Sequence, residues 1–327
     1  MTANSKKISA GSKTRGRRAV RLLRAIGFLA ALAGVAGFIL NGPLFVHTLS
    51  FLERYLSPDH HITAVGVSNI HGRLTLYGSL LLAAGVIVVL WARPLFERIS
   101  RLVALYGGLT GRRFSLALLW GSLITGVALV TSWFFRASPG IRLLYGEDRF
   151  LETATAVLFV CAAALLFVSA ARHRRSSAAH GKGVGVLLAA MGAVFLLMGL
   201  EEISWGQRLF HWATPAALEQ VNDQGELNLH NISNALLAPL YRWGTVALVA
   251  GTMAGWLWLS RRPGTVLRFF IPHVAMAALL ALIAIFGIGR LYGELLEELG
   301  SAFALFYALA VLRASRSRSR AELAGPP

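Results

Sequence analysis

The sequence has a single cysteine, Cys161, and few charged residues. Only 14% of its 327 residues are Asp, Glu, Lys or Arg, whereas 56% are hydrophobic. One cysteine excludes an intrachain disulfide and any metal site built from several thiolates. So little charge is far from the average of soluble globular proteins, and the composition therefore predicts a membrane protein.

Apolar runs follow one another along most of the chain. A helix of about twenty apolar residues crosses the hydrocarbon core of a bilayer, and several segments come close to this length. They are Ala25–Phe45, Leu74–Ala92, Phe114–Phe135, Phe150–Ala171, Val184–Leu200, Leu236–Leu259, Phe269–Gly289 and Gly293–Leu312. The sequence therefore predicts an all-α polytopic bundle of about eight transmembrane helices over residues 25–312.

The basic termini and two shorter patterns also fit a membrane protein. We expect residues 1–24, which are basic and rich in Gly and Ser, to be disordered or to lie against anionic lipid. Residues 313–327 form a second basic tail. The segment Arg93–Arg113 mixes basic and apolar residues, as in an interfacial amphipathic helix. Gly251 and Gly255 have the spacing of close helix packing.

The basic residues predict the orientation of the chain in the membrane. With eight spans, 24 of the 32 Lys and Arg residues fall on one side, and by the positive-inside rule that side is cytoplasmic. Both termini lie there, and 13 of the 15 acidic residues lie on the other side. The net charge of +17 is thus a sign of topology in a multi-pass cell-membrane protein, and we expect no nucleic-acid partner.

Acidic residues cluster at the predicted extracytoplasmic ends of the helices. Four groups are expected to converge there: Glu147, Asp148 and Glu152; Glu201 and Glu202; Glu219, Asp223 and Glu226; and Glu294, Glu297 and Glu298. Carboxylates near a helix N-terminus gain from the helix dipole, which explains several of them. Glu201 and Glu202 end a helix, where that dipole opposes them, so they need cations or a metal nearby.

The polar segment 201–235 supplies the other candidate site residues. Glu202, His230 and either Asp148 or Glu152 form a possible oxygen and nitrogen site for a divalent metal ion. Glu201 and Asp148 are the candidate catalytic acids and bases. The candidate substrate-binding residues are Gln207, Arg208, Asn228 and Asn231. The alternative is a structural network in which the acids pair with Arg149, Arg208 and Arg290.

Two stretches of this segment resemble a family of bacterial multi-spanning membrane proteins. These are EEISWGQR at Glu201–Arg208 and NDQGELNLHN at Asn222–Asn231. The resemblance groups these polar residues together and implies no particular activity. The segment differs from the EExxxR motif of CPBP-type intramembrane proteases, because Gly206 stands where that arginine is required.

Three functions are compatible with these patterns. The first is a membrane enzyme that acts on a lipid or lipid-linked substrate at the extracytoplasmic face, by metal-assisted hydrolysis or group transfer. The second is a transporter, although the predicted span centres carry almost no charge. The third is a non-catalytic membrane scaffold held together by structural ion pairs.

Overall fold

The computed structural model describes residues 3–39, 46, 64–136, 138–145, 150–175, 180–219, 234–288 and 294–323. Within these ranges the chain is helical, with no β-strand. It forms two compact units, Met1–Arg101 and Leu102–Pro327.

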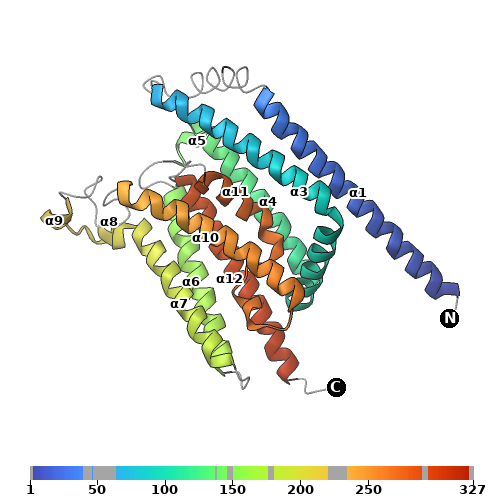
Figure 1. The fold of residues 1–327 in the computed structure, drawn as a ribbon. Helices are drawn as coiled ribbons and strands as arrows, with labels where there is room; N and C mark the ends of the chain where they lie inside the picture. The colour runs from blue at the N-terminus through green and yellow to red at the C-terminus, as the bar shows by residue number, and fades with distance from the viewer. Residues whose placement is uncertain are drawn as a thin grey trace. The chain divides into compact units, whose positions relative to one another are not determined.

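Long helices make up most of the described chain (Figure 1). They are α1 (Ala3–Ile39), α3 (Ala64–Thr110), α4 (Arg112–Phe134), α6 (Phe150–Arg175), α7 (Gly181–Glu202), α10 (Asn234–Arg261) and α12 (Glu294–Leu323). The shorter elements are α5 (Pro139–Arg142), η1 (Ser204–Gly206), α8 (Gln207–Phe210), α9 (Ala216–Glu219), η2 (Val266–Phe269), η3 (Val274–Met276) and α11 (Ala277–Ile288).

Six of the described helices are long and apolar enough to cross a membrane. They include residues Gly16–Ile39 of α1, Thr75–Thr110 of α3, all of α4, α6 and α7, and Glu294–Arg316 of α12. The predicted class, an all-helical membrane-type bundle, is therefore confirmed. The number of eight spans and the side of the termini stay predictions.

In the first unit, α1 and α3 run antiparallel and touch through glycines. A Cβ atom on Gly34 would lie 2.7 Å from the carbonyl oxygen of Gly78, and one on Gly27 would lie 2.9 Å from that of Gly85. Gly27 and Gly34 are seven residues apart, as are Gly78 and Gly85, so each pair lies on one face of its helix. The absence of side chains lets the two backbones meet, as is common between membrane helices.

Two parts of this unit differ from or extend the prediction. Residues 3–24, which we expected to be disordered or to lie against anionic lipid, form the first part of α1; Lys, Arg and Ala are good helix formers. The segment after Ala92 is helical, as predicted, but continues α3 across a kink at Trp91, where φ is −110° and ψ is 18°. Pro94 accounts for the kink, because proline cannot donate its backbone hydrogen bond and crowds the preceding turn.

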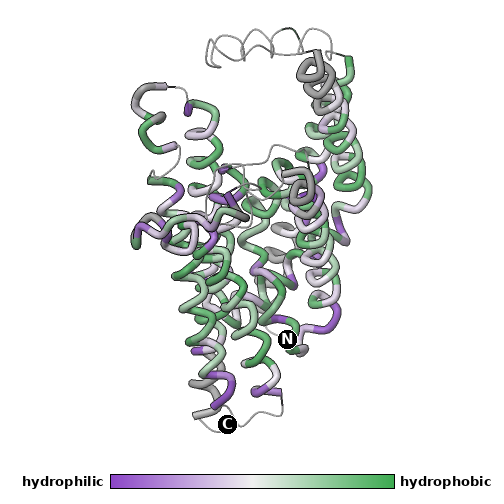
Figure 2. Tube along the Cα trace, turned by 90° about the vertical axis from the view of Figure 1, so that its left-hand side faces the viewer, coloured by the Kyte–Doolittle hydropathy of each residue, from purple (hydrophilic) through white to green (hydrophobic). Residues whose placement is uncertain are grey.

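In the second unit, α12 lies at the centre of the packing. It contacts α4, α6 and α11, while α7 packs along α6 and α10 packs along α11. The α6–α7 contact is close, because a Cβ atom on Gly199 would lie 3.1 Å from the carbonyl oxygen of Ala156. Hydrophobic residues run along these helices, and hydrophilic residues gather at their ends (Figure 2).

The seventh predicted span, Phe269–Gly289, is wrong as a single helix. The chain passes through η2, a non-helical stretch at Ile271–His273, and η3 before α11 starts at Ala277. Pro272 explains the break, because proline and the residue before it both disfavour the helical conformation. The 12 residues of α11 extend only about 18 Å, less than the hydrocarbon core of roughly 30 Å.

Candidate functional site

Carboxylates from three helices meet at one end of the second unit. Glu152 lies in the first turn of α6, Glu201 and Glu202 end α7, and Glu297 and Glu298 lie in the first turns of α12. Glu202 is half-buried, and the other four carboxylates are its electrostatic neighbours. The opposite ends of the same helices carry basic residues, such as Arg175 in α6 and Lys182 in α7. The described part of the chain thus brings together acids from three of the four predicted groups.

The remaining candidate residues are only partly placed. Asp148, Asn228, His230 and Asn231 lie outside the described residues. The backbone of Arg208 belongs to α8, but its side chain also lies outside the description. Gln207 is described, and its Nε2 donates a hydrogen bond to Thr214 Oγ1 at 2.6 Å. Among the described residues, no three His, Cys, Asp or Glu side chains are placed to hold a metal ion, so the predicted metal site is untested.

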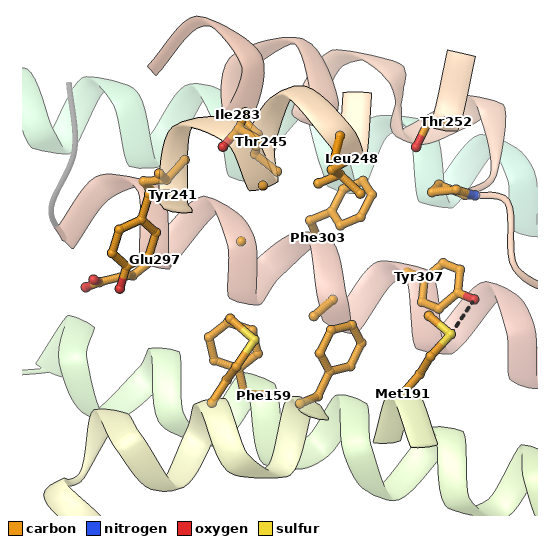
Figure 3. Close-up of a pocket in the computed structure, with 18 of the residues that line it drawn as sticks. Phe159, Met191, Tyr241, Thr245, Leu248, Thr252, Ile283, Glu297, Phe303 and Tyr307 are labelled. Carbon is orange, nitrogen blue, oxygen red and sulfur yellow. Dashed lines mark hydrogen bonds between the residues drawn. The ribbon is translucent and has the colours of Figure 1, made fainter. Parts of the chain in front are cut away.

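A large cavity begins at this acidic end and follows α12 into the unit. Its volume is about 1070 Å³. The α6–α7 pair and the α10–α11 pair form its walls, and α12 contributes Glu297, Gly300, Phe303 and Tyr307. Figure 3 shows Glu297 and Tyr241 at one end, and Tyr307, Met191 and Thr252 at the other. The residues between these ends are mainly apolar.

The cavity is open along one side. Leu197 and Met198 of α7 line it and are exposed, as are Leu248 and Gly251 of α10. Gly251 and Gly255 do not act as the predicted packing pair: Gly255 fits against Ile271, whereas a Cβ atom on Gly251 would meet nothing within 4 Å. The cavity is therefore a groove with exposed lining residues on α7 and α10 rather than an enclosed space.

Strained backbone shapes the mouth of the groove. After α7, Ser204, Trp205 and Gly206 have φ values of 47°, 56° and 79°. A left-handed conformation is common for glycine but rare for a bulky residue, and such outliers gather at functional sites. This turn directs the Trp205 indole to Glu201, where Nε1 donates a hydrogen bond to Oε1 at 2.5 Å. Both residues line the groove.

Two further groups near the acidic end are buried. Tyr145 follows α5 outside the predicted spans, and its hydroxyl lies 2.7 Å from Ser132 Oγ. Burial raises the pKa of Tyr145 to about 12, and Glu298 and Glu294 act in the same direction. Tyr145 is therefore a neutral hydrogen-bonding group. Glu298 is only 4% exposed, and neither carboxyl oxygen has a hydrogen-bond partner among the described residues.

The inner end of the groove is formed by the broken seventh span, a feature that the sequence analysis missed. Ile271 and Pro272 line the groove. Their backbone carbonyl oxygens accept hydrogen bonds from side chains. The Tyr106 hydroxyl donates to both at 3.1 Å, and Trp256 Nε1 donates to that of Pro272 at 2.8 Å. Tyr307 donates in the same way to Phe269 at 2.8 Å.

His273 fixes the end of this break. Its Nδ1 accepts a hydrogen bond from the Ala275 amide at 3.0 Å, which assigns the ring proton to Nε2. Nε2 lies 3.1 Å from Ser115 Oγ and 3.4 Å from Thr110 Oγ1. His273 lies within the predicted span Phe269–Gly289, and Pro272 is the sequence signal of the break.

No protein-family model, no curated protein and no solved structure matches the chain.

Proposed function

We propose that this protein is an integral membrane enzyme that binds a lipid or lipid-linked substrate in the groove and acts on it at the acidic end. The observation that carries the proposal is the groove itself, a cavity of about 1070 Å³ with an apolar body and Glu201 and Glu297 at its mouth. Ligand sites combine these features, an apolar lining and a few polar groups that fix orientation.

The shape of the groove suits an amphiphile. From Glu297 to Tyr307 the lining follows ten residues of α12, about 15 Å of helix. An acyl or polyprenyl chain would lie along Phe159, Leu248 and Phe303 in this stretch. The head group would then lie beside Glu201 and Glu297, where hydrolysis or group transfer takes place.

Glu201 is the proposed general base, because it lines the groove and its carboxylate is oriented by Trp205. Asp148 is the proposed second catalytic acid, and Gln207, Arg208, Asn228 and Asn231 would bind the polar part of the substrate. A divalent ion on Glu202 and Glu152 needs a further ligand from outside the described residues, and His230 is our candidate. If bound, such an ion would supply Lewis-acid activation.

The orientation that we propose has eight crossings, with the broken segment from η2 to α11 as the seventh, and both termini in the cytoplasm. The supporting observation is the separation of acidic and basic helix ends in α6, α7 and α12. The acidic mouth then opens to the extracytoplasmic leaflet of the cell membrane.

Filling the groove tests the proposal. Gly251→Phe places a ring in the groove from a position where a Cβ meets no protein atom, and Gly183→Phe is the matched control, because Gly183 in α7 also has no atom within 4 Å and lies outside the groove. We expect Gly251→Phe to reduce labelling by a photoactivatable acyl lipid several-fold, and Gly183→Phe to leave labelling unchanged. Equal labelling of both variants and the wild type would contradict a lipid-binding groove.

Catalysis is tested separately from binding. Glu201→Gln keeps the size of the side chain but removes the base, so we expect lipid labelling to continue while turnover of a membrane-lipid extract falls by about 10²-fold or more. Mass spectrometry of the lipid products measures that turnover. If Glu201→Gln matches the wild type, Glu201 is not the base; if the wild type converts no lipid, the groove binds lipid in a non-catalytic scaffold.

One observation favours transport as a second candidate. Transporters often have discontinuous helices whose exposed carbonyls bind the coupling ion, and the seventh span is broken. In this chain, however, the carbonyl oxygens at the break already accept hydrogen bonds from side chains. The acceptors belong to Phe269, Ile271 and Pro272, and the donors are Tyr106, Trp256 and Tyr307. Ion-dependent uptake by proteoliposomes would favour transport over catalysis.

A further inference from the structure

A second cavity lies in the first unit, between α1 and α3. Its volume is about 540 Å³, and its lining includes four guanidinium groups, those of Arg17, Arg21, Arg24 and Arg93. We propose that it binds the phosphate of an anionic glycerophospholipid. This site is separate from the groove and does not depend on the proposed enzymatic function.

The arrangement of the arginines follows from the helix repeat. Arg17, Arg21 and Arg24 are spaced by four and three residues, so they lie on one face of α1. Arg93 faces them from α3, and its Nε donates to Glu97 Oε1 at 3.2 Å. With four guanidinium groups and one carboxylate in its lining, the cavity has a net charge of +3.

Guanidinium groups are well suited to binding the phosphate of a lipid head group. Each presents a planar set of N–H donors that can bind two phosphate oxygens at once. Val20 and Phe96 complete the cavity with apolar surface, which fits the glycerol and first methylene groups of a lipid better than a hydrated free anion.

The position of the cavity favours a lipid as the source of that phosphate. It lies at the polar end of the apolar helix Gly16–Ile39. Directly beyond Arg24, the apolar side chains of Ile26, Phe28 and Leu29 are more than half exposed. A phospholipid with its phosphate among the arginines would place its acyl chains on this surface. Basic sites between membrane helices recognise anionic head groups in this way.

The test compares two double variants that lose the same charge. R21Q/R24Q removes two arginines from the cavity, whereas R18Q/R98Q removes two from α1 and α3 outside its lining. Binding of dioctanoyl phosphatidylglycerol to the purified full-length protein is measured by native mass spectrometry, with dioctanoyl phosphatidylcholine, a zwitterion without net charge, as the reference. We expect R21Q/R24Q to bind phosphatidylglycerol about tenfold more weakly or worse, and R18Q/R98Q to bind it like the wild type.

Several outcomes would overturn the proposal. Equal weakening by the two double variants would show diffuse attraction rather than a site. Equal binding of phosphatidylcholine would show that the net negative charge of the lipid is not recognised. Displacement of the lipid by inorganic phosphate at similar concentration would identify a free-phosphate site. Should R21Q/R24Q fail to fold, Arg93→Gln tests the same cavity from α3, and wild-type affinity in that variant would contradict the proposal.

Discussion

A few side chains form hydrogen bonds with the backbone at the break in the seventh predicted span. A backbone interrupted among membrane helices exposes carbonyl and amide groups that must find partners inside the protein. Tyr106, Trp256 and Tyr307 supply donors for the carbonyls, and His273 accepts from the Ala275 amide. The break is therefore stabilised by side-chain hydrogen bonds to its backbone and is a regular part of the fold rather than a local failure of the helix.

His273→Ala is expected to destabilise the protein. His273 is 2% exposed, and its removal leaves the Ala275 amide without an acceptor and Ser115 without its contact to the ring. An unsatisfied buried polar group costs about 1–3 kcal/mol, so the unfolding temperature in detergent should fall by several degrees. His180→Ala is the control, because His180 is exposed. If both variants unfold at the same temperature, the network around His273 does not contribute to stability.

The candidate site shows which residues a sequence can reveal. Glu201, Glu202 and Glu297 were identified because a charged residue at the end of an apolar run is conspicuous. The number of Lys and Arg residues in each connecting segment then predicted that these acids share one side of the membrane. The groove was not predictable in that way, since Phe159, Leu248 and Phe303 are ordinary members of apolar runs. Their common lining depends on which helices are neighbours, and that is set by packing rather than by local pattern.

At the scale of elements, the helix pairs differ in what holds them together. Between membrane helices there is no strong hydrophobic driving force, so close backbone approach and van der Waals contact dominate. α1 and α3 achieve this through Gly27, Gly34, Gly78 and Gly85. The same short side chains make the pair sensitive to substitution.

Gly34→Leu is expected to separate α1 from α3. A Cβ at Gly34 would lie 2.6 Å from the backbone nitrogen of Leu82, so the helices must move apart and lose their contact. Overpacking of this kind costs about 1–3 kcal/mol or more. The matched control is Gly72→Leu in α3, where a Cβ meets nothing within 4 Å. The unfolding temperature and elution profile in detergent measure the difference; equal behaviour of both variants would show that the contact is dispensable.

The helices themselves were predicted well, and the reason is physical. A run of apolar residues has to satisfy its backbone internally in a membrane, so hydropathy predicts a helix with little interference from tertiary structure. The prediction failed for the span Phe269–Gly289, because Pro272 interrupts the helix within an otherwise suitable apolar run. Low hydrophobicity gave no such guide to residues 3–24, which we expected to be disordered or to lie against anionic lipid and which form the start of α1.

At the scale of the whole molecule, the separation of acidic and basic residues predicts how the chain is oriented in the membrane. By the positive-inside rule, we expect the acidic mouth of the groove to face the extracytoplasmic leaflet. The proposed substrate would then come from that leaflet.

Cysteine labelling measures that orientation directly. Cys161 is the only cysteine, so Cys161→Ala gives a background without thiols. Ala216→Cys then marks the acidic side and Arg262→Cys the basic side, and both positions are exposed. We expect a membrane-impermeant maleimide to label Ala216→Cys in intact cells, and to label Arg262→Cys only after the cells are opened. The reverse pattern would place the acidic mouth in the cytoplasm, and the substrate would then have to come from the inner leaflet.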